Sequence, residues 1–86
     1  MISGAQIRAA RALLGVSAAE MAKRADISHR TLQRFEAADG LPDAQTRLLE
    51  RVKVALEAMG VRFSGDPVSS PGVQLQRPHP EEPQDT

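Results

Sequence analysis

The chain has 86 residues, with no Cys, Trp or Tyr and only two Phe. This length fits one small domain with a modest hydrophobic core, so a partner or a second copy is expected to add stability. The lack of Cys excludes disulfides, thiolate metal sites and a catalytic thiol, and no cofactor is expected.

Charge is divided between two parts of the chain, although the formal total is zero. Residues 1–63 contain ten Lys or Arg and seven Asp or Glu, which gives a net charge of +3. Residues 64–86 contain one Arg and four acidic residues, which gives −3. Because Lys and Arg supply most of the non-specific affinity for nucleic acids, the basic part is the candidate for phosphate binding.

The N-terminal apolar stretch is interrupted by Arg8 and Arg11. It therefore lacks the continuous apolar run of a signal peptide or of a membrane span. We expect a soluble cytoplasmic protein without a membrane partner.

Two capping boxes mark the starts of the first two predicted helices. Ser3 with Gln6, and Ser17 with Glu20, have the spacing at which a hydroxyl and a longer side chain satisfy each other's backbone N–H groups. The first box predicts a helix over residues 4–14, and the second predicts a helix of about two turns.

A third helix is predicted directly after the second. Asp26 stands where the chain must turn, and Asp tolerates left-handed backbone better than most residues. Ser28 then caps a helix predicted over about residues 28–39.

A fourth helix is predicted to begin at the N-cap Asp43 and to end at Gly60. Its apolar residues recur at helical spacing: Leu48, Val52, Ala55, Leu56 and Met59. This stripe favours a buried helix face.

The chain is expected to divide into three parts. Residues 1–60 form the helical domain. Residues 61–77 contain the alternating segments 61–63 and 73–75, which predict a β-hairpin whose register the sequence leaves open. Residues 78–86 are rich in Pro and charge and contain nothing to bury, so we expect a disordered acidic tail.

Residues 16–36 have the organisation of a helix-turn-helix unit, in which two short helices are joined by a tight turn. At 100° per residue, Leu32 and Phe35 lie on one side of the second helix of the unit. The opposite side carries His29, Arg30, Gln33, Arg34 and Ala37. A row of charged residues on an arbitrary helix is most often a solvated face. At this position in the unit, a DNA-reading face is favoured instead.

The sequence resembles the lambda-repressor-like, or Cro/repressor-type (XRE-family), helix-turn-helix domains over residues 3 to about 60. The resemblance is carried by Arg11, the Leu14-Gly15-Val16-Ser17 helix start, Met21-Ala22, Ile27-Ser28, Leu32 and Phe35-Glu36. It implies a mostly α fold of four helices. It also implies that the third helix enters the major groove of double-stranded DNA, where the base-contacting residues are His29, Arg30, Gln33 and Arg34.

The side-chain chemistry agrees with this implication. Arg30 and Arg34 can each bind guanine O6 and N7, Gln33 can bind adenine N6 and N7, and His29 can donate to a purine or a phosphate. The residues expected to contact the DNA backbone, together with the N-terminal N–H groups of the two helices, are Ser17, Lys23, Ser28 and Thr31.

The chain departs from the family pattern at three places. Ala18 stands where a Gln commonly braces the reading helix, and Asp26 replaces the usual turn Gly. The predicted hairpin over residues 61–75 takes the place of a fifth helix.

Other interpretations of conspicuous residues are mostly structural. The resemblance implies that Arg11 and Glu36 form an ion pair that ties the first helix to the third. His29 and His79 are far apart in sequence and lack ligand-like spacing, so no metal site is expected. No nucleophile with a base, paired acid and base, or Gly-rich phosphate loop is present, which argues against an enzyme.

Two functions remain after this exclusion. The first is a homodimeric transcription regulator, associated with the nucleoid when bound, which reads a pseudo-palindromic site. Its dimer contacts are expected from the fourth helix and the hairpin, where an edge strand can pair with its twin. The alternative is an antitoxin or adaptor that binds a partner protein through residues 61–86, with DNA binding serving autoregulation.

Overall fold

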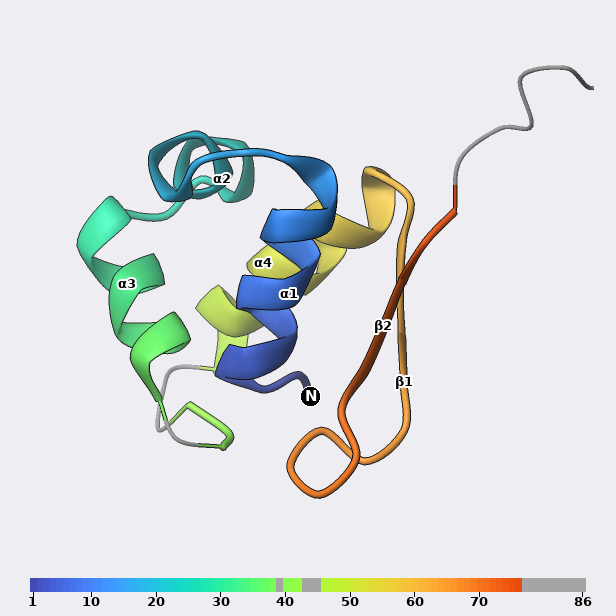
Figure 1. Ribbon diagram of the computed structural model, residues 1–86. Coiled ribbons are helices and arrows are strands. Elements are labelled where there is room, and N and C mark those ends of the chain that lie inside the picture. The colour runs from blue at the N-terminus through green and yellow to red at the C-terminus, as the bar shows by residue number, and fades with distance from the viewer. Residues whose placement is uncertain (39, 43–45, 77–86) are drawn as a thin grey trace, which may run out of the picture.

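The computed structural model describes residues 1–38, 40–42 and 46–76. Within them, four helices precede an antiparallel two-stranded hairpin (Figure 1). The elements are α1 (Gly4–Leu14), α2 (Ala18–Ala25), α3 (His29–Ala37), α4 (Thr46–Ala58), β1 (Val61–Ser64) and β2 (Gly72–Leu75). This confirms the predicted fold class of four helices followed by a short hairpin. None of these helices is long and apolar enough to cross a bilayer.

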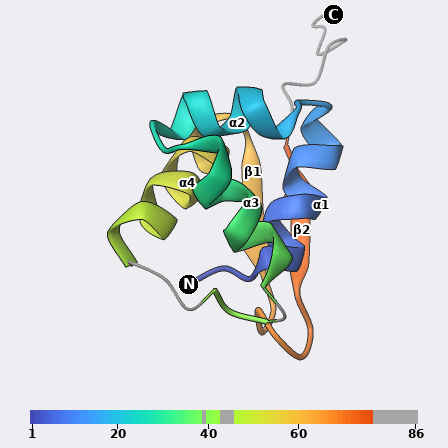
Figure 2. The same ribbon diagram turned by 90° about the vertical axis from the view of Figure 1, so that its left-hand side faces the viewer.

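The central element is α1, which separates α3 from the hairpin (Figure 1). In the view turned by 90°, α3 faces the reader, α4 and α1 lie to its two sides, and both strands lie behind (Figure 2). The hairpin is therefore on the side of the domain opposite to α3.

Side-chain caps begin the first three helices as predicted. At α1 the capping box is complete, because Ser3 Oγ accepts from the Gln6 N–H and Gln6 Oε1 accepts from the Ser3 N–H. At α2 the Ser17 hydroxyl accepts from the Glu20 N–H, but the predicted box is not completed. The Glu20 carboxylate instead accepts from Arg24, one turn further along the same helix.

The turn between α2 and α3 adopts the predicted left-handed conformation, with Asp26 at φ 59°. α3 begins after Ser28 but ends at Ala37, two residues before the predicted end, because Ala38 is already extended. The loop that follows is held to α1 through the Gly4 N–H, which donates to the Gly40 carbonyl at 3.2 Å. Local sequence does not reveal this contact between residues 36 positions apart.

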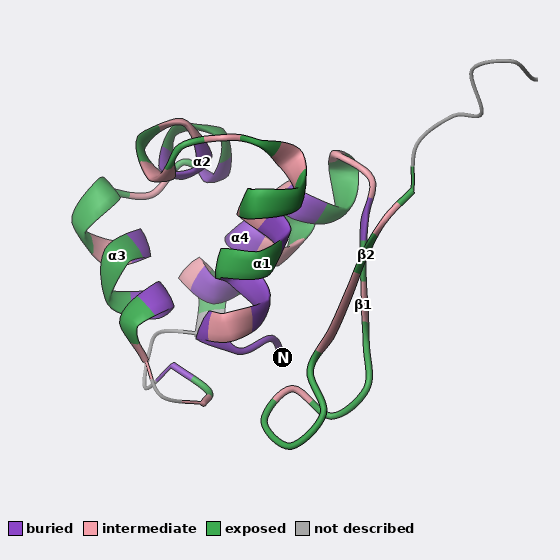
Figure 3. Ribbon diagram, viewed as in Figure 1, coloured by how far each residue is buried: buried purple, intermediate pink, exposed green. Residues whose placement is uncertain are grey.

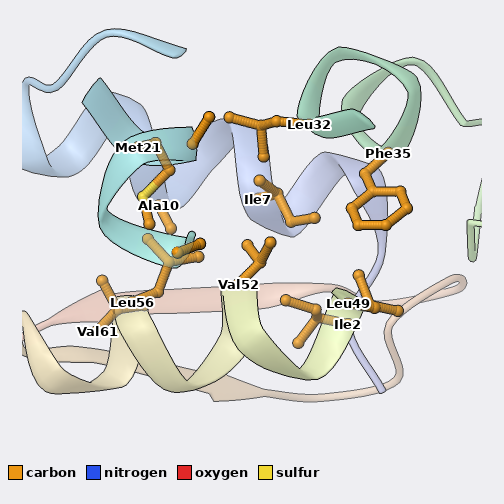
Figure 4. Close-up of a cluster of buried hydrophobic side chains, with 12 residues drawn as sticks. Ile2, Ile7, Ala10, Met21, Leu32, Phe35, Leu49, Val52, Leu56 and Val61 are labelled. Atoms are coloured by element: carbon orange, nitrogen blue, oxygen red, sulfur yellow. The ribbon is translucent and has the colours of Figure 1, made fainter. Parts of the chain in front are cut away.

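All four helices and β1 contribute to one hydrophobic core (Figures 3 and 4). Val52 and Leu56 of the predicted stripe are fully buried, whereas Leu48 is only partly buried and the neighbouring Leu49 takes its place in the core. The largest fully buried apolar side chains are Phe35, Ile2, Ile7, Met21, Leu32, Leu56, Val52 and Val61. The predicted N-cap Asp43 and the tail 78–86 lie outside the described residues.

The hairpin is packed into this core and pairs Val61 with Leu75 and Phe63 with Val73. Val61 is fully buried, and its cross-strand partner Leu75 packs against the same cluster. The buried Gln6 of α1 adds polar contacts, since its Nε2 donates to the Gly72 carbonyl at 3.0 Å and to the Ser64 carbonyl at 3.4 Å. Thus Gln6 joins the first turn of α1 to the closed end of the hairpin.

Candidate nucleic-acid interface

The outer side of α3 carries the four residues that the sequence predicts as base contacts. His29, Arg30, Gln33 and Arg34 are all exposed. Leu32 and Phe35 on the opposite side are fully buried. Burial of one side therefore fixes which side of α3 points to solvent, as the colouring of Figure 3 makes visible.

Three of the four residues predicted to contact phosphates, Ser17, Ser28 and Thr31, lie at the N-termini of α2 and α3. Ser28 Oγ accepts from the Thr31 N–H at 3.0 Å and donates to Thr31 Oγ1 at 2.8 Å. Ser17 is exposed at the N-cap of α2, and Lys23 is exposed in its last turn. Backbone N–H groups at a helix N-terminus attract anions, so both helix starts are chemically suited to a phosphate.

An ion pair fixes α3 against α1. Arg11 Nε and Nη2 donate to the two carboxylate oxygens of Glu36 at 2.9 and 3.0 Å. The Glu36 side chain is only 10% exposed and that of Arg11 is 26% exposed. Hydrogen bonding to Glu36 raises the pKa of Arg11, partly against the effect of burial. In a third contact, Arg11 Nη1 donates to the Val16 carbonyl, so the same side chain also holds the loop before α2.

Two further contacts position α3, and the sequence predicted neither of them. Arg8 Nη1 donates to the Glu36 carbonyl near the end of α3. At the other end, Arg51 of α4 donates to the Asp26 carbonyl at 3.0 Å, within the turn that leads into α3. Neither contact has a local sequence signal, because the partners are 28 and 25 residues apart.

Close backbone packing completes the support of α3. A Cβ atom on Gly4 would lie 2.5 Å from the Phe35 carbonyl oxygen and 3.0 Å from that of Ala38. Only Gly therefore lets the start of α1 approach the last turn of α3 so closely. Thus α3 is held at its start, at its end and along its buried side.

Electrostatics on the exposed side of α3 favour an anion. The predicted base contacts include Arg30 and Arg34, while the acidic residue of this helix, Glu36, is turned inward to Arg11. A polyanion that approaches α3 therefore meets two guanidinium groups and helix N-termini.

Comparison with known proteins agrees with this geometry. The chain matches the family profile described as "Helix-turn-helix domain" over residues 4–63, which include α1 to α4 and most of β1. Neither the curated proteins nor the solved structures contain a significant match. The chain therefore belongs to the helix-turn-helix domain family, a class of DNA-binding domains.

Proposed function

We propose that this protein is a transcription regulator of the lambda-repressor-like (XRE-family) type, which inserts α3 into the major groove of a pseudo-palindromic operator. The observation that carries the proposal is the row of exposed side chains at residues 29, 30, 33 and 34, on a helix whose other side is fully buried. A rigid helix with polar groups at this spacing suits direct readout of base edges.

Specificity is assigned to the two arginines and the glutamine of this row. Arg30 and Arg34 read guanine, Gln33 reads adenine, and His29 contacts a purine or a phosphate. Ser17, Lys23, Ser28 and Thr31 contact the DNA backbone and set the register without reading sequence.

A homodimer reads both half-sites, about 10 bp apart, only when both copies of α3 face the same side. In the view onto α3, α4 lies beside it and the hairpin lies behind it (Figure 2). A contact along the exposed side of α4 keeps both α3 helices facing the duplex, whereas a contact through the outer face of the hairpin turns them apart. We therefore place the dimer contact on α4, around the 53% exposed Val54.

The experiment is a selection of bound duplexes from a random-sequence library, followed by anisotropy titrations of the best duplex. Arg30→Ala and Arg34→Ala are each expected to cost about 1–3 kcal/mol on that duplex and to relax preference at one base pair. Lys23→Ala is expected to weaken all duplexes alike and to reduce the salt slope by about 1. Recovery of no common motif would refute sequence-specific reading.

A matched control separates local contacts from net charge. Arg62→Ala removes one exposed positive charge from the hairpin, on the side opposite to α3. It is expected to leave base preference unchanged and to alter affinity far less than Arg30→Ala. If both variants lose the same affinity, the α3 row acts only as general positive charge.

The dimer contact has its own test. Val54→Glu is expected to convert the dimer to a monomer in sedimentation velocity and to remove two-fold symmetry from the selected motif. Val68→Glu is the control, because Val68 is a similarly exposed valine in the hairpin loop. An unchanged sedimentation coefficient for Val54→Glu would place the dimer contact elsewhere.

A further inference from the structure

The outer edge of β2 carries backbone groups that the hairpin does not use. The Gln76 N–H donates to the Gly60 carbonyl at 2.8 Å, which makes these two residues a hydrogen-bonded pair of the antiparallel ladder. Pairs alternate along such a ladder, so Gln74 also faces β1, whereas Val73 and Leu75 direct their N–H and C=O groups outward. This edge can accept another strand.

An apolar groove runs beside this edge, under α1. It is lined by Ala9, Ala12, Leu13, Pro71 and Val73. None of these side chains is charged, and Leu13 is 44% exposed although it is a large apolar residue. The two alanines let a backbone approach the helix closely.

The packing of the helices explains why the groove exists. Two helices cover one face of a sheet of only two strands, with α1 against β2 and α4 against β1. Because two helices side by side need about 8–10 Å and neighbouring strands only about 4.8 Å, we expect α1 to extend beyond the edge of β2. A third strand would continue the existing contact between α1 and β2.

Two other occupants fit this groove poorly. The chain's own residues 77–86 have Pro at three positions, which removes N–H donors, and offer no other apolar side chain. A second copy that pairs β2 with its twin would carry its own α1 over the same edge. The two α1 helices would then collide at the two-fold axis between the paired strands.

We propose that the α1–β2 groove binds an extended segment of another protein by strand addition. The segment pairs its backbone with Val73 and Leu75 and places uncharged, apolar side chains at alternate positions against Leu13 and its neighbours. Since β2, whose edge the segment joins, lies on the side of the domain away from α3 (Figure 2), the segment and DNA bind at the same time. This binding does not depend on the DNA-reading role proposed above.

The test uses a phage-displayed library of random linear peptides, selected on the full chain. Peptides with alternating apolar residues and without central Pro are expected to be enriched. N-methylation of the best synthetic peptide is expected to weaken binding about fivefold at every second residue, as one lost hydrogen bond, and to have little effect between them. That two-residue period distinguishes strand addition from non-specific apolar binding.

Matched variants locate the peptide on the domain. Leu13→Glu is expected to weaken peptide binding at least about tenfold, because it places a charge in the groove. Leu41→Glu is the control, since Leu41 is similarly exposed but lies outside the groove. Circular dichroism checks that both variants fold.

Several outcomes would overturn the proposal. These are a selection that enriches no peptide, a binding peptide without the two-residue period, and equal effects of the two leucine variants. A dimer that Leu13→Glu converts to a monomer would assign the groove to a second copy. Competition between peptide and duplex DNA would place the peptide on the α3 side, whereas loss of DNA specificity alone would leave this inference intact.

Discussion

The ion pair between Arg11 and Glu36 is expected to stabilise the domain far more than a second pair of the same chemistry. Both Arg11–Glu36 and Arg24–Glu20 have an Nε-to-carboxylate distance of 2.9 Å. The side chains of the first pair are 26% and 10% exposed, and those of the second are 51% and 43% exposed. Charge type and the shortest distance are the same in the two pairs, but Arg11–Glu36 is more buried and has a second hydrogen bond, from Arg11 Nη2.

The expected coupling energies follow from this difference. An exposed pair one helical turn apart contributes about 0.3–0.5 kcal/mol. Removal of one partner from a buried pair costs about 3–5 kcal/mol, so the half-buried Arg11–Glu36 pair is expected to couple by about 2 kcal/mol. A loss of that size lowers the Tm of a domain this small by about 8–16 °C.

Double-mutant cycles with Ala at each position test these values. Unfolding in urea is followed by far-UV circular dichroism, because the chain has neither Trp nor Tyr as a fluorescent probe. The Arg11–Glu36 coupling is also expected to persist at high salt, where exposed pairs are screened. Equal coupling energies in the two cycles would refute the argument that burial and a second hydrogen bond strengthen the Arg11–Glu36 pair.

Three further substitutions test other parts of the fold. Gly4→Ala is expected to destabilise the domain by about 2 kcal/mol, because the added Cβ meets the backbone of α3, whereas Gly15→Ala has open space and costs only about 1 kcal/mol for its positive φ. Urea denaturation would contradict this if the two costs were equal. Asp26→Gly is expected to stabilise by about 0.5 kcal/mol, since φ 59° suits Gly, and a lower Tm would refute this reason. Hydrogen bonds from the Ser69 and Val68 N–H groups lower the pKa of Asp66 in the folded protein. Ionised Asp66 therefore stabilises the fold at pH values above the pKa of an unfolded Asp, and this stabilisation is lost as the pH falls through the lower pKa of the folded state. An NMR titration of Asp66 that gives an ordinary pKa would contradict this.

Local chemistry predicted the starts of the first three helices and the turn between α2 and α3. Ser3, Ser17 and Ser28 act within three residues of themselves, and Asp26 responds to its own backbone conformation. The burial of Leu32 and Phe35 follows from helical periodicity, so the exposed side of α3 was predictable as well.

Features that depend on contacts between distant residues could not be predicted from the sequence. The early end of α3 coincides with contacts from Gly4 and Arg8, which precede it by about 30 residues. Register of the hairpin could not be predicted, because a short alternation permits several alignments and the choice depends on packing of Val61 against the helices. The roles of Gln6 and Arg51 were not predicted for the same reason, since a sequence does not indicate which distant carbonyl a long side chain will contact.

The buried amide of Gln6 has a consequence for how the chain is made. Synthesis proceeds from the N-terminus, so α1 leaves the ribosome long before the carbonyls of Ser64 and Gly72, which its first turn requires. Until those carbonyls are available, the Gln6 amide must remain hydrated, and the first turn of α1 cannot be fully buried. Of the four described helices, α1 is synthesised first, yet the polar contacts of its first turn are complete only once the hairpin has formed, so loss of the hairpin would affect residues that lie about 60 positions earlier in the sequence.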